Sequence, residues 1–369
     1  MDQKLLDRAH ALNDKGAELY HSGDYHAARQ YYENSLDIKM DLLGADNYDT
    51  ASTMSNLGLA LMKLGDLEQA KSYFEKYLNI VRRKFGETHP DAASGLDNLG
   101  LLSQRMEDFQ AARHCHEKAL EIRQKTLGEN HPETASSLHN LCFLLSYLGY
   151  YQIARPYGEQ ALKIRRQLLG EQHPDTAESL AAMAGLLHDI GDYHESQQLY
   201  EKALEIRLKV LGIKHPSTLP TLDNLFVVLE KTGEFQTARF YYEQVIEACR
   251  QTYGSEHSQT ASAINAFGVL LHRQGNLEEA LPCFEKACAI QCKVLGEEHP
   301  NTAQSLNNIS AVCYQQKKYA RSAMFERRAL AAATRSLGAD HPTILDYQRV
   351  LKDIEQKLKQ RRETPWLHP

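Results

Sequence analysis

Apolar residues recur at the spacing of a helix, in two successive runs that repeat along the chain. Between Pro132 and Gly149 the first run keeps a period of three or four residues, which is typical of a helix with one buried face. A second, longer run follows it and ends at Gly170. The apolar positions of this example are Ala135, Leu138, Leu141, Cys142 and Leu145 in the first run and Ile153, Ala154, Tyr157, Ala161, Leu162 and Ile164 in the second. The pattern predicts a pair of amphipathic helices, called here helix A and helix B.

The helix pair repeats every 42 residues without insertion or deletion. Eight glycines at this interval end the B segments: Gly44, Gly86, Gly128, Gly170, Gly212, Gly254, Gly296 and Gly338. A histidine follows seven of them after three residues, and in all but one case the next residue is proline: His89, His131, His173, His215, His257, His299 and His341. Glycine closes a helix and proline suits a first turn, so short loops are expected between pairs. A strict period of this length predicts stacked copies of one unit.

Small residues recur at one position in each predicted helix. Helix A carries Gly16, Gly58, Gly100, Cys142, Ala184, Gly268 and Ser310, with Phe226 as the exception. Helix B carries Ala28, Ala70, Ala112, Ala154, Ser196, Ala238, Ala280 and Ser322. Small side chains at a crossing point let two helix backbones approach each other. We therefore expect the helices of each pair to cross at these positions.

A turn glycine lies seven residues after the small position of helix A and five before that of helix B. It is Gly23, Gly65, Gly149, Gly191, Gly233 or Gly275 in six of the pairs. With this spacing the chain resembles the tetratricopeptide repeat (TPR) family, and its recurring LGxxHPxTAxSLxNL phrase is similar to the 42-residue repeats of kinesin light chains. HEAT repeats have a similar period but lack the small-residue signature. The heptad coiled coil of kinesin light chains is missing, which argues against a motor role.

The resemblance implies an all-α fold, a right-handed superhelical solenoid of eight helix–turn–helix TPR repeats with a C-terminal capping helix. We expect the repeats in residues 1–342, the capping helix in 343–362 and a disordered tail in 363–369, which contains Trp366. Pro220, early in a helix A, is expected to distort the sixth repeat locally.

Composition excludes several classes of partner. The net charge of −6 and a pI near 6.3 give no basic footprint for nucleic acid. Mean hydropathy is −0.52 and no apolar run is long enough to span a membrane, so neither a membrane partner nor a signal peptide is expected. A cytoplasmic location is the expected default. Cys142, Cys288 and Cys313 fall at small or aliphatic positions, so we interpret them as reduced core thiols.

The recurrent histidines and the cysteines of one helix could indicate metal, but the spacing argues against it. Each histidine lies in a separate loop with a helix pair between it and the next, whereas one ion needs its ligands together. Structural capping is the expected role of the histidines. Cys283, Cys288 and Cys292 lie in one helix, where two of them replace packing residues. No nucleophile elbow or phosphate loop appears, so we expect no enzyme, no metal and no cofactor.

In the TPR family the groove lined by helices A holds a peptide, and helical spacing selects the residues that face it here. With Ala51, Met54, Leu57, Gly58 and Leu61 buried, the groove side carries Ser52, Ser55, Asn56, Leu59, Met62 and Lys63. Three columns follow at 42-residue steps: asparagines (Asn56, Asn98, Asn140, Asn224 and Asn308), apolar residues (Leu59, Leu101, Phe143, Val227, Val269 and Ala311) and cations (Lys63, Arg105, Lys231 and Arg273). Ala182 and Ala266 break the first column, and Tyr147 and Asp189 break the third.

Each column has a functional and a structural interpretation. An asparagine amide both donates and accepts, so the ladder could bond the main chain of a bound strand, as in the family, or bond a neighbouring helix. The apolar column could offer pockets or pack against the adjacent helix A. The cations could attract acidic residues of a ligand or form a solvated row.

Together these features predict a non-enzymatic protein-interaction scaffold that binds an extended peptide of a protein partner, one with some acidic residues, in its concave groove. The alternative hypothesis is a regulatory subunit that binds a catalytic or effector partner through its outer surface.

Overall fold

The computed structural model describes residues 2–213, 215–337 and 342–363, and in these ranges the fold is built from helices without any strand. Contacts divide the chain into two units, residues 1–232 and 233–369, which are described separately. The helices of the first unit are α1 (Asp2–Ser22), α2 (Tyr25–Leu43), α3 (Tyr48–Leu64), α4 (Leu67–Phe85), α5 (Pro90–Arg105), α6 (Phe109–Thr126), α7 (Pro132–Tyr147), α8 (Tyr151–Leu169), α9 (Pro174–Ile190), α10 (Tyr193–Val210) and α11 (Thr218–Thr232). Those of the second are α12 (Phe235–Tyr253), α13 (Ser258–Arg273), α14 (Leu277–Val294), α15 (Pro300–Gln315), α16 (Tyr319–Leu337) and α17 (Pro342–Glu363).

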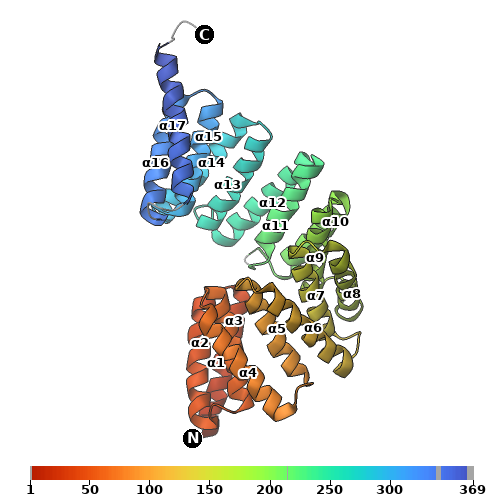
Figure 1. The fold of residues 1–369 in the computed structure, drawn as a ribbon. Coiled ribbons are helices and arrows are strands. Elements are labelled where there is room, and N and C mark those ends of the chain that lie inside the picture. Colours follow the sequence, from red (N-terminus) through yellow and green to blue (C-terminus); the bar gives the residue numbers. More distant parts are fainter. Residues whose placement is uncertain (1, 214, 338–341, 364–369) are drawn as a thin grey trace. The chain divides into compact units, whose positions relative to one another are not determined.

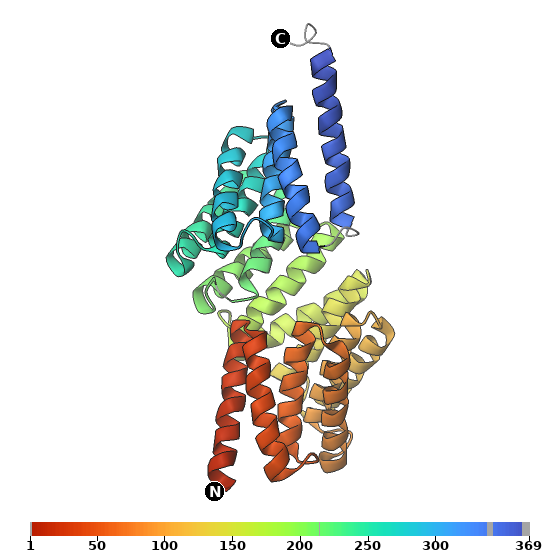
Figure 2. The ribbon, with the colours of Figure 1, turned by 90° about the vertical axis from the view of Figure 1, so that its left-hand side faces the viewer.

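Within each unit, helices A and B alternate and each packs on its neighbours in sequence. Figure 1 shows α1 to α10 following one another in this order, and the odd-numbered helices are the predicted helices A. In the second unit α17 packs on α16, and Figure 2 shows the two side by side. The predicted all-α solenoid of helix pairs with a final single helix is therefore confirmed. Gly338, His341 and Trp366 lie outside the described residues.

The recurrent histidines cap helices A, as predicted. The His131 Nδ1 atom accepts a hydrogen bond of 3.2 Å from the Glu133 backbone N–H, which the first turn of α7 would otherwise leave without a partner. The same cap begins α5, α9, α13 and α15, at His89, His173, His257 and His299. His215 also accepts from Ser217 N–H, but α11 begins later, at Thr218. The ring of Pro220 would clash with the carbonyl four residues earlier, that of Pro216, in a longer helix.

The turn between helices A and B requires a left-handed backbone even where glycine is absent. Gly65 and Gly191 close α3 and α9 with φ of 89° and 96°. At the equivalent positions of two other repeats, Glu107 and Lys317 adopt φ of 62° and 59°. A side chain in this conformation is strained, so the helix packing on both sides imposes the turn.

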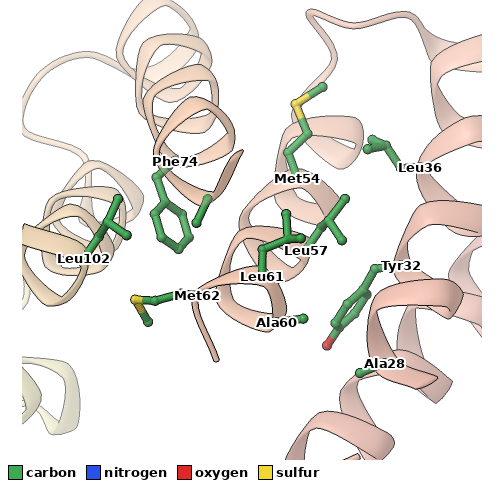
Figure 3. Close-up of a cluster of buried hydrophobic side chains, with 11 residues drawn as sticks. Ala28, Tyr32, Leu36, Met54, Leu57, Ala60, Leu61, Met62, Phe74 and Leu102 are labelled. Atoms are coloured by element: carbon green, nitrogen blue, oxygen red, sulfur yellow. The ribbon is translucent and has the colours of Figure 1, made fainter. Parts of the chain in front are cut away.

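The small positions of helix A leave space for a ring of helix B. A Cβ atom at Gly58 would lie 2.6 Å from the Phe74 ring, and one at Gly16 would lie 2.7 Å from the Tyr32 ring. Figure 3 shows Tyr32 and Phe74 on either side of the buried α3 residues Leu57 and Leu61. The small positions of the two helices also meet directly, since the Ser196 hydroxyl on α10 donates to the Ala184 carbonyl on α9 at 2.6 Å. The structure adds that the glycines receive aromatic side chains. The larger Cys142 is matched by Gly158 on α8, where a Cβ would lie 2.7 Å from the Cys142 Sγ atom.

Buried polar pairs join five of the described helices B to the next helix A. The Arg165 guanidinium on α8 donates to the Ser179 hydroxyl on α9 at 2.9 Å, and both residues are buried. Equivalent pairs, 14 residues apart, are Lys39–Thr53, Arg123–Ser137, Arg207–Thr221 and Gln291–Ser305. Two repeats have no polar pair at these positions: one has Val81 and Gly95, and the other has Cys249 and Ala263. The two positions therefore change together, because a buried cation needs an acceptor.

The structure bears on two classes that the sequence argued against, membrane-spanning proteins and metal-binding proteins. None of the described helices is long and apolar enough to cross a membrane. Within the described ranges, no group of three or more His, Cys, Asp and Glu side chains could hold a metal ion. The Cys288 and Cys292 sulfur atoms lie 3.9 Å apart on α14, while Cys142, Cys288 and Cys313 are buried as predicted.

Candidate peptide-binding groove

The asparagine ladder lies on helices A, and three of its members bond the preceding helix A. The Nδ2 atom of Asn56 donates to Asn13 Oδ1 at 3.1 Å, and that of Asn98 donates to the Ser55 hydroxyl at 3.0 Å. In the second unit Asn308 donates to Asn265 Oδ1 at 3.1 Å. The structural interpretation therefore holds at these three positions. The groove assignment of Ser55 is wrong, since this acceptor is buried between α3 and α5.

The other two ladder residues are placed differently. Asn224 is exposed on α11 and hydrogen-bonds the Tyr200 hydroxyl. Asn140 is half-buried on α7. In the described part of the chain, the Oδ1 atoms of Asn56 and Asn98 accept no hydrogen bond, while their Nδ2 atoms are used; both residues are half-buried.

The apolar and cationic columns meet in one cavity of about 390 Å³, which we call the cationic pocket. Successive helices A α3, α5 and α7 lie next to each other, so residues 42 apart come together along this face. The lining consists of Tyr20, Leu59, Met62, Lys63, Leu101, Gln104, Arg105, Phe109, Phe143 and Tyr147. Five of these ten are predicted site residues: Leu59, Leu101, Phe143, Lys63 and Arg105.

The aromatic wall of this pocket is open to solvent. Phe143 is 55% exposed and Tyr147 is 68% exposed, although both lie on a helix whose opposite face is fully buried. The Tyr147 ring packs on Phe109 of α6, with 5.4 Å between the ring centroids. Large exposed rings beside a cavity are the usual anchors of protein interfaces.

The two cations of the pocket have no acidic partner among the described residues. Loss of surrounding water lowers the pKa of Lys63, the like charge of Arg105 lowers it further, and Glu178 acts in the opposite direction. Lys63 and Arg105 lie at the same place on adjacent helices, so their charges repel each other. An anion bound between them would relieve this repulsion.

A second cavity of about 550 Å³, called here the mixed-charge pocket, continues from the first toward α9 and α11. Both pockets share Phe143 and Tyr147. The other lining residues are His139, Ser146, Glu178, Ala181, Ala182, Gly185, Leu186, His188, Asp189, Tyr200, Arg207 and Asn224.

The charged groups of the mixed-charge pocket differ in exposure. Burial opposes ionisation of Glu178, but neighbouring His139 and Arg165 outweigh it and hold the pKa of this carboxyl below its usual range. The Glu178 side chain is 50% exposed and accepts from Arg165 at 3.0 Å. Arg207 is only 8% exposed and donates to the Thr221 hydroxyl and the Ser217 carbonyl. Asp189 is exposed, with His188 Nδ1 at 3.1 Å from its carboxylate.

The remaining predicted residues lie on other helices, where Val227, Lys231 and Arg273 are exposed and Asn308 is half-buried. Val227 and Lys231 lie on α11 in the first unit. Arg273 on α13 and Asn308 on α15 belong to the second unit, so the structure does not join them to the two pockets. The predicted set is therefore brought together at α3, α5 and α7.

Sequence reasoning missed several lining residues. Phe109 belongs to a recurrent apolar position at the start of helix B, occupied by Tyr25, Leu67, Tyr151 and Tyr193 in other repeats, so the 42-residue period could have marked it. Tyr20 lies 42 residues before Met62, and Glu178 lies 126 residues after Ser52, so the same period assigns both to the groove side.

The fold and these pockets define a helical repeat protein with an open, partly aromatic groove, and comparison with known proteins gives its family. The chain belongs to the tetratricopeptide repeat family, whose model matches residues 7–83, 49–124, 91–166, 133–209, 175–251, 227–293 and 259–335. This confirms the family predicted from the spacing of the small residues. No curated protein matches the chain.

Solved structures show the same architecture. One is a crystal structure of nearly identical TPR-like repeats of a protein described as a kinesin light chain from Podosopora anserina, with 28% identity and a TM-score of 0.51, covering 56% of this chain and 97% of that one. The apo form of RapI has 16% identity and a TM-score of 0.56, covering 97% and 98%. The STAND protein with a TPR sensor from Pyrococcus horikoshii has 12% identity and a TM-score of 0.61, covering 94% and 53%. The last two show the fold alone.

Proposed function

We propose that this chain is a scaffold that binds an extended segment of a protein partner along the face formed by α3, α5, α7 and α9. TPR repeats imply a protein-interaction role, and proteins of this kind are generally not enzymes. One observation carries the proposal: Lys63 and Arg105, without acidic partners among the described residues, lie beside the exposed rings of Phe143 and Tyr147. The rings would anchor apolar side chains, and the cations would bind a carboxylate of the segment.

The free Oδ1 atoms of Asn56 and Asn98 support an extended ligand. Each can accept a backbone N–H of a strand whatever its side chains are, while its Nδ2 atom keeps neighbouring helices in register. The predicted ligand role and the structural role of the ladder are therefore compatible.

A comparison of two charge-reversal variants tests the proposal. Partners captured from extracts of the source cell by the wild type should be lost by the Lys63→Glu/Arg105→Glu double variant. Lys202 and Lys209 are exposed on α10, a helix B, and their reversal to Glu gives a control with the same change of charge. Equal capture by both double variants would contradict the groove assignment. Loss in the control alone, with amide protection on helices B, would favour the outer-surface regulatory subunit instead.

A further inference from the structure

The third column, an interrupted row of cations in the sequence, changes from positive to negative charge within the first unit. It runs from Lys63 and Arg105 through Tyr147 to Asp189, on α3, α5, α7 and α9. The first two line the cationic pocket, Asp189 lines the mixed-charge pocket, and Tyr147 lines both. In space, this column therefore has a positive end, an aromatic middle and a negative end.

Glu178 adds to the negative end. It lies on α9, like Asp189, and half of its side chain is exposed in the mixed-charge pocket. It also acts on Lys63, whose protonated form it favours, so the two ends of the groove are close enough to interact without an ion pair between them. The cations near these carboxylates are less available: Arg165, which does not line the pocket, is held by Glu178 and Ser179, and the pocket residue Arg207 is buried against Thr221. Burial lowers the pKa of His139, whose Nε2 atom lies 3.8 Å from the Glu178 carboxylate.

We propose that this groove selects a segment of protein chain with an acidic residue at one end, a basic residue at the other and an apolar side chain between them. The acid binds Lys63 and Arg105, the apolar side chain packs on Phe143 and Tyr147, and the base binds Asp189 and Glu178. This inference rests on the proposed function and specifies its ligand. A purely acidic segment would fit the first pocket but would bring like charges together at Asp189, which opposes binding. The order of charges also fixes the direction in which the segment lies.

The aromatic middle of the groove can contact the apolar side chain of the segment and also the basic side chain next to it. Phe143 and Tyr147 are one helical turn apart on α7, so both rings lie on the same face of this helix and line both pockets. A lysine or arginine side chain that leaves this surface toward Asp189 passes over an aromatic ring, which attracts cations. The aromatic rings therefore attract the basic side chain of the segment before its charged group reaches Asp189.

Selection from a random twelve-residue peptide display library tests the proposal without a known partner. Sequences enriched on the wild-type protein should carry acids and bases at opposite ends of an apolar centre, in one order along the chain. The best peptide is then synthesised with a fluorescent label, together with a form in which its basic residues are serine. We expect the serine form to bind about two- to fivefold more weakly, the range of one exposed ion pair.

The Asp189→Lys variant should reverse this preference: it should bind the serine form at least as well as the wild type does, and the original peptide more weakly. Glu205 is exposed on α10, and Glu205→Lys, which changes charge equally, should preserve the wild-type preference. Enriched peptides with acids alone, bound equally by wild type and Asp189→Lys, would overturn the polar selection and leave the groove function standing. Enriched peptides unaffected by Lys63→Glu/Arg105→Glu, or no enrichment, would count against the groove itself.

Discussion

The ionisation of Glu326 depends on the place of this residue in the repeat. It occupies the helix B position at which Tyr32, Phe74 and Phe284 fill the space over a glycine, but its helix A counterpart is Ser310. The Glu326 side chain is fully buried, and its uncharged donors are Ser310 and the Asn307 amide. No described cation forms an ion pair with it, so burial raises the pKa of this carboxyl to about 7.

This pKa predicts a stability loss with rising pH. The folded state keeps the proton of Glu326 above pH 4.5, where an unfolded chain releases it, so the stabilisation is complete below pH 4.5 and is lost as pH rises through 7. The loss amounts to about 3 kcal/mol. Glu326→Gln keeps the shape without the charge and should unfold at a higher temperature than the wild type at pH 8, with a much smaller difference at pH 5. Thermal melting at both pH values measures this, and a difference independent of pH would refute it.

At the scale of the element, several helix pairs are fixed by complementary side-chain sizes at one position. Gly58 and Gly268 lie under Phe74 and Phe284, whereas Cys142 lies beside Gly158. In these pairs the larger residue belongs to either helix and the other is small, whereas the sixth repeat has Phe226 and Tyr242 at the two positions. The sequence columns show this exchange only once the structure has identified which positions face each other.

Gly58→Ala should therefore destabilise the protein even though alanine favours a helix. The gain in helix propensity is about 1 kcal/mol, and forcing a methyl group into the Phe74 ring costs about 1 to 3 kcal/mol. Gly185→Ala is the matched control, since its methyl group would meet only the Tyr200 hydroxyl, at 3.1 Å, and should be neutral or stabilising. Urea unfolding followed by circular dichroism compares them. Adding Phe74→Leu should restore part of the loss in Gly58→Ala, and a lack of any rescue would exclude the ring as its cause.

At the scale of the whole molecule, stability should be local because helices contact mainly their sequence neighbours within each unit. The buried pairs such as Arg165–Ser179 connect one repeat to the next and no further. Repeat arrays of this kind behave as a sum of units and nearest-neighbour interfaces. A single free energy of unfolding is then a poor description of the chain.

Hydrogen exchange should resolve this locality. Gly58→Ala should accelerate amide exchange in α2 to α5 and leave α13 to α16 at wild-type rates. Gly268→Ala, whose methyl group would lie 2.8 Å from the Phe284 ring, should do the reverse. Mass spectrometry of exchanged peptides measures both variants against the wild type. Faster exchange over the entire chain in either variant would show that the array unfolds as one body.

The residues of the site that recur at the 42-residue interval were predictable from the sequence. Leu59, Lys63, Leu101, Arg105 and Phe143 were found because the period assigns equivalent residues to one face of adjacent helices A. Tyr20 and Glu178 were not named, although the same period places them in the columns of Met62 and Ser52 on the groove side. The asparagines were found, but their bonds to Asn13 and Ser55 required the actual distance between helices.

By itself, the sequence determined the repeat, the helix boundaries, the histidine caps and the family, because local signals recur at a constant interval and each recurrence supports the others. Only the tertiary structure decided that the glycines receive rings, that Glu326 is buried without a charged partner, and that an interrupted row of cations forms a groove with two oppositely charged ends. These features depend on side chains from different repeats meeting in space, and no spacing along the chain fixes such a meeting.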